Sequence, residues 1–104
     1  MAGSFFQSVY EIVAQIPYGS VLSYGDIARL IGYPRRARFV GYAMRVCPDG
    51  LPWHRVIRAD GSIAGGDFAP VREMLLRAEG VPFTEDGRVD ISACRAGIAR
   101  PRKS

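Results

Sequence analysis

Two short helical patterns joined by a glycine-containing turn constrain the fold of this chain more than any other feature of its sequence. The first pattern begins at a capping box, in which Ser23 caps the helix and Asp26 reaches back to it. Gly32 supplies a left-handed residue at the end of this helix, and Pro34 prevents the helix from continuing. The second helix is predicted over residues 35–45. Two short helices separated by a turn of about three or four residues form a helix-turn-helix.

One further helix is predicted on each side of this pair. Ser4 and Gln7 have the spacing of a capping box that opens the first of them. Its predicted buried stripe consists of Phe5, Val9, Ile12, Val13 and Ile16. The other helix is predicted over residues 70–79 and ends at Gly80. Its predicted inward face consists of Val71, Met74, Leu75 and Ala78.

An extended segment is predicted from Trp53 to Ile63. The β-branched pair Val56-Ile57 favours a strand, and Asp60-Gly61 is typical of a hairpin turn. The predicted fold class is therefore mainly α with a small β hairpin, in a winged helix-turn-helix-like DNA-binding domain. We expect this domain to span residues 1–94 and a basic C-terminal tail to span residues 95–104.

Composition limits the classes of protein to consider. A length of 104 residues fits one domain. No apolar run approaches the roughly 18 residues of a membrane span, and no leader pattern suggests export. Cys47 and Cys94 give neither a metal-ligand spacing nor a disulfide framework. We therefore expect a cytoplasmic monomer without cofactor or metal, associated with the nucleoid if the source is bacterial.

Positive charge is concentrated in the middle of the chain. Residues 35–58 carry six arginines against Asp49, which gives +5, and residues 59–90 sum to −4. Duplex DNA holds about one negative charge per 1.7 Å of its axis, so a clustered basic surface binds it well. The alternative reading is a solvated arginine-rich face without a ligand.

The helix predicted over residues 35–45 has two distinct faces. At about 100° per residue, Val40, Ala43 and Met44 point inward. The opposite face is basic and includes Gly41, and the small residues Ala37 and Gly41 would let the helix backbone approach a narrow groove in DNA. The candidate DNA contacts on or beside this helix are Arg35, Arg36, Ala37, Arg38, Phe39, Gly41, Tyr42 and Arg45.

The segment Pro52-Trp53-His54-Arg55-Val56-Ile57 closely resembles the PCHRV[IV] active-site motif of O6-alkylguanine-DNA alkyltransferases. Residues 16–19, 23–28, 37–41 and 75–80 match further motifs of that family in the same order. In those enzymes the cysteine takes the alkyl group from a damaged guanine. Trp53 stands at that position here, and an indole has no ionisable sulfur. The chain thus resembles the alkyltransferase-like proteins, which are relatives without the chemistry, and the expected fold is that of the alkyltransferase C-terminal domain.

This resemblance implies that the helix-turn-helix docks on the minor groove, which is only about 6 Å wide, and it implies roles for particular residues in the binding of DNA. Arg38 matches the arginine that enters the base stack and replaces an extruded nucleotide. Tyr24 matches a tyrosine that meets the phosphate beside that nucleotide and assists its rotation. Phe39 departs from the family, which carries a small residue there, and two roles are open for it: entry into the DNA groove or packing against the domain.

The resemblance also implies a pocket for the extruded base. Trp53 offers a flat wall on which a base can stack. The predicted lining consists of Trp53, Tyr24, Cys47, His54, Gly65 and Gly66. The predicted scaffold around it consists of Pro52, Arg55 and Glu79. His54 and Glu79 match a pair that activates the cysteine in the enzymes, and we expect them only to hold the pocket loop here, so no residue is assigned a catalytic role.

The function predicted from these residues is that of a non-enzymatic sensor of O6-alkylguanine in duplex DNA. The resemblance further implies that nucleotide excision repair proteins receive the bound lesion. Two alternatives remain open at this point. One is an active alkyltransferase that uses a relocated nucleophile, Cys47 or Cys94, and the other is a sequence-specific winged-helix transcription regulator.

Overall fold

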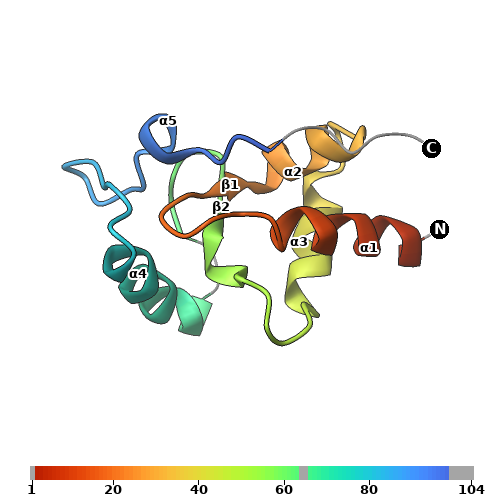
Figure 1. Cartoon of the computed structure of the whole chain (residues 1–104), viewed down its shortest axis with the longest axis horizontal. Coiled ribbons are helices and arrows are strands. Elements are labelled where there is room, and N and C mark those ends of the chain that lie inside the picture. Colours follow the sequence, from red (N-terminus) through yellow and green to blue (C-terminus); the bar gives the residue numbers. More distant parts are fainter. Residues whose placement is uncertain (1, 64–65, 99–104) are drawn as a thin grey trace.

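Five α-helices and a two-stranded sheet make up the fold in the computed structural model, which describes residues 2–63 and 66–98. The helices are α1 (Ala2–Val13), α2 (Tyr24–Ile31), α3 (Ala37–Arg45), α4 (Ala69–Ala78) and α5 (Ile91–Cys94). The strands are β1 (Leu22–Ser23) and β2 (Val56–Ile57), and two 3-10 helices are η1 (Trp53–Arg55) and η2 (Gly66–Phe68). In Figure 1, α1, α2 and α3 gather at one end, α4 and α5 lie at the other, and the two strands lie between them. The predicted mainly helical class is confirmed.

The helix-turn-helix consists of α2 and α3, as predicted. The Asp26 amide donates to the Ser23 hydroxyl oxygen at 3.0 Å, and the Asp26 carboxylate accepts from the Ser23 amide at 3.0 Å. These reciprocal bonds satisfy two backbone donors at the start of α2. Gly32 ends the helix at a φ of 99°, in the left-handed region. The following helix begins at Ala37, two residues later than predicted.

Helix α1 begins earlier than predicted. It starts at Ala2, so Ser4 lies inside the helix and the predicted capping box at Ser4 is wrong. Its buried stripe is confirmed, since Val9, Ile12 and Val13 are fully buried. The periodicity of apolar residues therefore located the packing face of the helix better than a local capping pattern located its first residue.

The predicted β hairpin is wrong, although its strand residues do lie in a sheet. Strand β2 pairs in parallel with β1, with Leu22 opposite Val56. Trp53 begins a 3-10 turn rather than an extended segment. The turn near Gly61 does form, with a φ of 86° and a bond of 2.9 Å from the Gly61 amide to the Arg58 carbonyl. A β-branched pair favours a strand but does not specify its partner, and here the partner is the chain leading into α2.

Helix α4 buries a different face from the one predicted. Leu76 is fully buried, whereas Val71 is 39% exposed and Met74 is 61% exposed. The predicted inward residue Ala78 is also exposed, and Leu75 is half-buried. The orientation of α4 follows from the second of two buried clusters, to which the helix contributes Leu76. That cluster consists of Val21, Ile57, Leu76, Val81, Val89, Ile91 and Cys94.

The first buried cluster joins α1, α2 and α3 and holds the helix-turn-helix in place.

Residues 95–98, which we expected to belong to a loose tail, pack against the domain. Arg95 forms a parallel bridge with Val21, and the Ala96 amide donates to the Val21 carbonyl at 2.9 Å. The Arg95 guanidinium also donates to Asp26 at 3.1 Å. The predicted boundary at residue 95 is therefore too early, and the rest of the predicted tail, residues 99–104, lies outside the described residues.

Candidate nucleic-acid interface

The outward face of α3 is basic and exposed. Val40, Ala43 and Met44 are buried in the first cluster, as predicted. Arg38, Tyr42 and Arg45 are exposed on the other side. Gly41 lies among them with open space where a Cβ would point. The helix therefore offers cationic groups around a flat stretch of backbone, an arrangement suited to a phosphate backbone.

A groove of about 1040 Å³ lies along this face of α3. It is bounded by α2, α3, the turn after α3, the start of η1 and the beginning of α4. Its lining consists of Tyr24, Gly25, Ala37, Arg38, Gly41, Tyr42, Met44, Arg45, Cys47, Pro48, Asp49, Trp53, Arg58, Ala59, Gly66, Phe68 and Arg72. Four of these residues are arginines, and Asp49 is the single carboxylate among them. The groove is thus positively charged and includes an indole.

Most of the predicted site residues meet in this groove. Those that line it are Tyr24, Ala37, Arg38, Gly41, Tyr42, Arg45, Cys47, Trp53 and Gly66. Arg35, Arg36, Phe39 and His54 do not line it. Gly65 lies outside the described residues.

Phe39 packs on the flank of the groove. Its ring lies 5.5 Å from the Tyr42 ring at 87°, and the guanidinium carbon of Arg36 lies 5.3 Å from the Phe39 ring centre. The same guanidinium carbon lies 5.7 Å from the Tyr33 ring centre. Phe39 therefore holds Arg36 between two aromatic rings, which favours the packing role over entry into the groove.

Of the groove residues that the sequence did not predict, Arg72 has the most contacts with a predicted one, Trp53. Its guanidinium carbon lies 4.7 Å from the centre of the Trp53 ring, and its Nη1 donates to the Trp53 carbonyl at 3.0 Å. Burial lowers the pKa of this guanidinium below its ordinary value, although arginine remains charged at neutral pH. No motif marks this residue, because an arginine on a helix is normally read as part of a solvated face.

His54, which we predicted to line the pocket, points instead to a buried carboxylate beneath it. Its Nε2 lies 2.6 Å from a Glu79 carboxylate oxygen. Arg55 donates to the same carboxylate at 2.8 Å from Nη2, and the Gly19 amide donates to it at 2.9 Å. Nη1 of Arg55 also donates to the Ile16 carbonyl at 2.8 Å. Glu79 therefore ties η1 to the chain between α1 and β1, as expected for a scaffold pair.

These donors set the ionisation of Glu79. Burial alone would raise the pKa of this carboxyl, but hydrogen bonds from Arg55, Gly19 and His54 outweigh that effect and lower the pKa to about 2. The ordinary value for a glutamate is 4.5. The folded state therefore binds the proton of Glu79 less readily than the unfolded state does.

Protein stability is expected to depend on this carboxyl in acid. The contribution of Glu79 is complete above pH 4.5 and is lost as the pH falls from 4.5 through about 2. The free energy of unfolding, measured by urea titration across that range, should fall more steeply for the native protein than for Glu79→Gln. A matched variant, Glu73→Gln, removes a half-exposed carboxylate and should keep the native slope. Parallel curves for all three proteins would contradict this assignment.

Cys47 does not have the surroundings of a reactive thiol. Burial raises its pKa, and the nearby charge of Arg72 only partly opposes this effect. A raised pKa leaves little thiolate at neutral pH, and the thiolate is the nucleophile.

Among the described residues, no group of three or more histidine, cysteine, aspartate or glutamate side chains could hold a metal ion. None of the described helices is long and apolar enough to cross a membrane.

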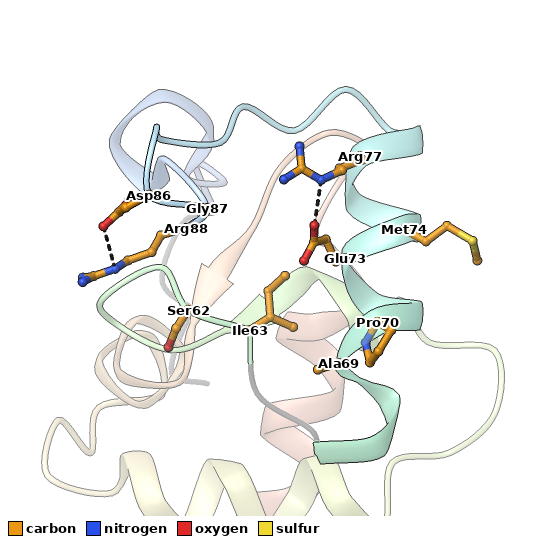
Figure 2. Close-up of a pocket in the computed structure, with 10 residues that line it drawn as sticks. All are labelled: Ser62, Ile63, Ala69, Pro70, Glu73, Met74, Arg77, Asp86, Gly87 and Arg88. Carbon is orange, nitrogen blue, oxygen red and sulfur yellow. Dashed lines mark hydrogen bonds and ion pairs between the residues drawn. The ribbon is translucent and has the colours of Figure 1, made fainter.

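A second depression lies on another face of α4, and no predicted site residue lines it (Figure 2). Its charged groups are paired with one another: Arg77 with Glu73 at 2.9 Å, and Arg88 with Asp86 at 3.2 Å. Ile63, Pro70 and Met74 supply its apolar part. The groove along α3 is therefore the better candidate site, since its four arginines form no ion pair within residues 2–63 and 66–98 and it includes the Trp53 indole.

Comparison with known proteins agrees with this fold and identifies the family. Residues 4–81 match the family model described as 6-O-methylguanine DNA methyltransferase, DNA binding domain. The chain belongs to this family. A DNA base-flipping protein of Escherichia coli strain K12 is 47% identical over 96 residues, which cover 88% of this chain and 74% of the relative. Alkyltransferase-like protein 1 of Schizosaccharomyces pombe is 48% identical over 67 residues, which cover 62% of each protein. Within the family, the chain groups with these alkyltransferase-like proteins.

Solved structures give the same grouping. Schizosaccharomyces pombe Atl1 in complex with damaged DNA containing O6-carboxymethylguanine matches with a TM-score of 0.80 and 35% identity, covering 92% of this chain and 97% of that one. A Mycobacterium tuberculosis OGT in complex with DNA matches with a TM-score of 0.67 and 40% identity. That match covers 73% of this chain and 48% of the other, so the likeness to the OGT is limited to part of it. The predicted helix-turn-helix fold is confirmed by both.

Proposed function

We propose that this protein is a non-enzymatic sensor that binds O6-alkylguanine in duplex DNA and flips the damaged nucleotide. The observation that carries the proposal is the groove itself, because it joins the basic face of α3 to Trp53 in one continuous surface. Relatives named as base-flipping proteins, and a similar structure solved with damaged DNA, support the same function.

The proposed binding mode follows from the arrangement of the groove. The outward face of α3 docks on the minor groove through Arg45 and the backbone near Gly41. Arg38 enters the base stack, and Tyr24 contacts the adjacent phosphate. An alkylated guanine pairs badly, so the cost of extruding it, normally a few kcal/mol, is reduced. The flipped base then lies in the part of the groove that contains Trp53 and Gly66.

No alkyl transfer accompanies this binding in our proposal. By the resemblance of its motif, Trp53 stands where the enzymes have their acceptor cysteine, and burial raises the pKa of the Cys47 thiol, which disfavours the nucleophilic thiolate. We further propose that the bound complex is passed to nucleotide excision repair proteins, as the resemblance to alkyltransferase-like proteins implies. We also propose a cytoplasmic location, on the nucleoid if the source is bacterial.

The test compares the affinity of the protein for matched duplexes with and without one O6-methylguanine, at one fixed salt concentration. Mass spectrometry of the protein follows. A preference for the lesion in several unrelated sequences, with no gain in mass, is the expected result. A mass increase of one alkyl group on Cys47 would identify an alkyltransferase instead. A preference for one DNA sequence whatever its lesion would identify a transcription regulator.

Emission from Trp53 should report flipping directly, because it is the only tryptophan in the chain. A flipped guanine beside the indole should quench that emission strongly. Intact DNA, held through its phosphates with its bases stacked, should quench it little even at saturation. Raising the salt concentration should shift both binding curves while the difference at saturation persists. Equal quenching by intact and alkylated duplexes at saturation would show that Trp53 senses only docking.

A further inference from the structure

Arg72 has hydrogen-bonding capacity that the folded protein leaves unused. Its Nη1 donates to the Trp53 carbonyl at 3.0 Å. Its Nε is buried and has no hydrogen-bond partner among the described residues. A buried donor without a partner costs free energy and therefore calls for an explanation, such as a ligand, an ion or a water molecule that completes the site. Because Arg72 lines the groove, an acceptor brought by a ligand can approach its guanidinium.

Arg72 differs from the other arginines of the groove in its fixed position. Arg38, Arg45 and Arg58 are exposed, whereas Arg72 is half-buried. Its guanidinium is seated over the Trp53 ring at 4.7 Å and is also bonded to the backbone of that residue. A cation that is already ordered and partly desolvated interacts more strongly with an anion than a solvated one does.

The placement of Arg72 on Trp53 connects it to the damaged base. The guanidinium lies over the Trp53 ring and lines the same groove, so a flipped guanine that lies against Trp53, as in the proposed function, can direct its O6 substituent toward this guanidinium. A methyl or ethyl group offers no acceptor there. A carboxylate offers two oxygens and a negative charge, which match the paired N–H groups of arginine.

We propose that Arg72 makes the pocket selective for O6-alkyl groups that end in a carboxylate over neutral groups of the same size. This inference rests on the proposed function, because it requires the flipped base to lie beside Trp53. It adds a residue on α4 that determines specificity, outside both the helix-turn-helix and η1.

The experiment compares two lesions that differ mainly in charge. Duplexes carry O6-carboxymethylguanine, O6-carbamoylmethylguanine, which is its neutral amide, or unmodified guanine, at one fixed salt concentration. The native protein should bind the carboxylate about tenfold more tightly than the amide, as expected for a charge-assisted bond. In Arg72→Gln this ratio should fall to about one. Arg72→Lys should retain part of it, because lysine keeps the charge but loses the planar pair of donors.

Arg77→Gln is the matched control. Arg77 lies on the same helix, but it faces the second depression and pairs there with Glu73 (Figure 2). The control should keep the native ratio. Affinity for unmodified DNA shows whether each variant is folded. If Arg72→Gln is not folded, the proposal is tested by the carboxylate-to-amide affinity ratio of the native protein and by the decrease of that ratio in Arg72→Lys.

The outcomes separate the two levels of the proposal. If the native protein binds both lesions better than unmodified DNA but equally well, Arg72 is only a support for Trp53 and this inference is overturned. An unchanged ratio in both Arg72 variants would overturn it as well. If neither lesion is preferred over unmodified DNA, the proposed function itself fails.

Discussion

Glu79→Ala should lower the free energy of unfolding by about 3 kcal/mol, a large share of the roughly 5–15 kcal/mol typical of a domain. The substitution removes the common acceptor of His54, Arg55 and the Gly19 amide. The side chains of His54 and Arg55 are only 12% and 16% exposed, so water replaces this acceptor poorly. The midpoint of thermal unfolding should fall by roughly 12 °C or more. Urea titration and thermal denaturation at neutral pH provide the measurement.

Glu73→Ala is the control for this substitution. Its carboxylate pairs with Arg77, but the two side chains are 45% and 52% exposed, so the loss should stay below about 1 kcal/mol. Glu79→Gln should be less damaging than Glu79→Ala, because the amide still offers an oxygen to Arg55. Equal losses for Glu79→Ala and Glu73→Ala would show that the buried network contributes no more than a surface pair.

Arg38→Ala should reduce the preference for alkylated over intact DNA by about tenfold to a hundredfold. The proposed role of this side chain is to stack in the space left by the flipped base, and such stacking is worth roughly 1–3 kcal/mol. Its removal should change the salt dependence little. Binding of matched duplexes at several salt concentrations measures both quantities.

Arg45→Ala provides the comparison on the same helix. Arg45 lines the same groove about two turns further along α3, where we expect only a phosphate contact. Its loss should weaken both duplexes about equally and flatten the salt dependence by up to about one unit. Identical behaviour of the two variants would reduce Arg38 to a phosphate contact and remove the main support for flipping.

The sequence predicted the helix-turn-helix well because its signals are local. The cap at Ser23 and the glycine at position 32 specify backbone geometry within a few residues. The apolar period of α3 then identifies its outward face, which includes Arg38. Most of the candidate groove follows from these short-range patterns together with the motif around Trp53.

The features that the sequence did not predict depend on contacts between distant segments. The pair Val56-Ile57 read as part of a hairpin, but its partner is β1, more than thirty residues earlier. The inward face of α4 is the face that packs against the second buried cluster, and the periodicity of the helix alone does not show on which side that cluster lies. Arg72 joins the groove only because α4 packs beside Trp53, so no local pattern could have distinguished it from a surface arginine.

The bridge between Arg95 and Val21 makes the C-terminal part of the domain a support for the segment that leads into α2. The family match ends at residue 81, yet Val89, Ile91 and Ala96 are buried beyond it. The Arg95 side chain also donates to Asp26, the partner of the cap residue Ser23 in the capping box of α2. The segment matched by the family model is therefore shorter than the segment that packs into the domain, and a truncation after residue 81 would remove the contact that Arg95 makes at the start of α2.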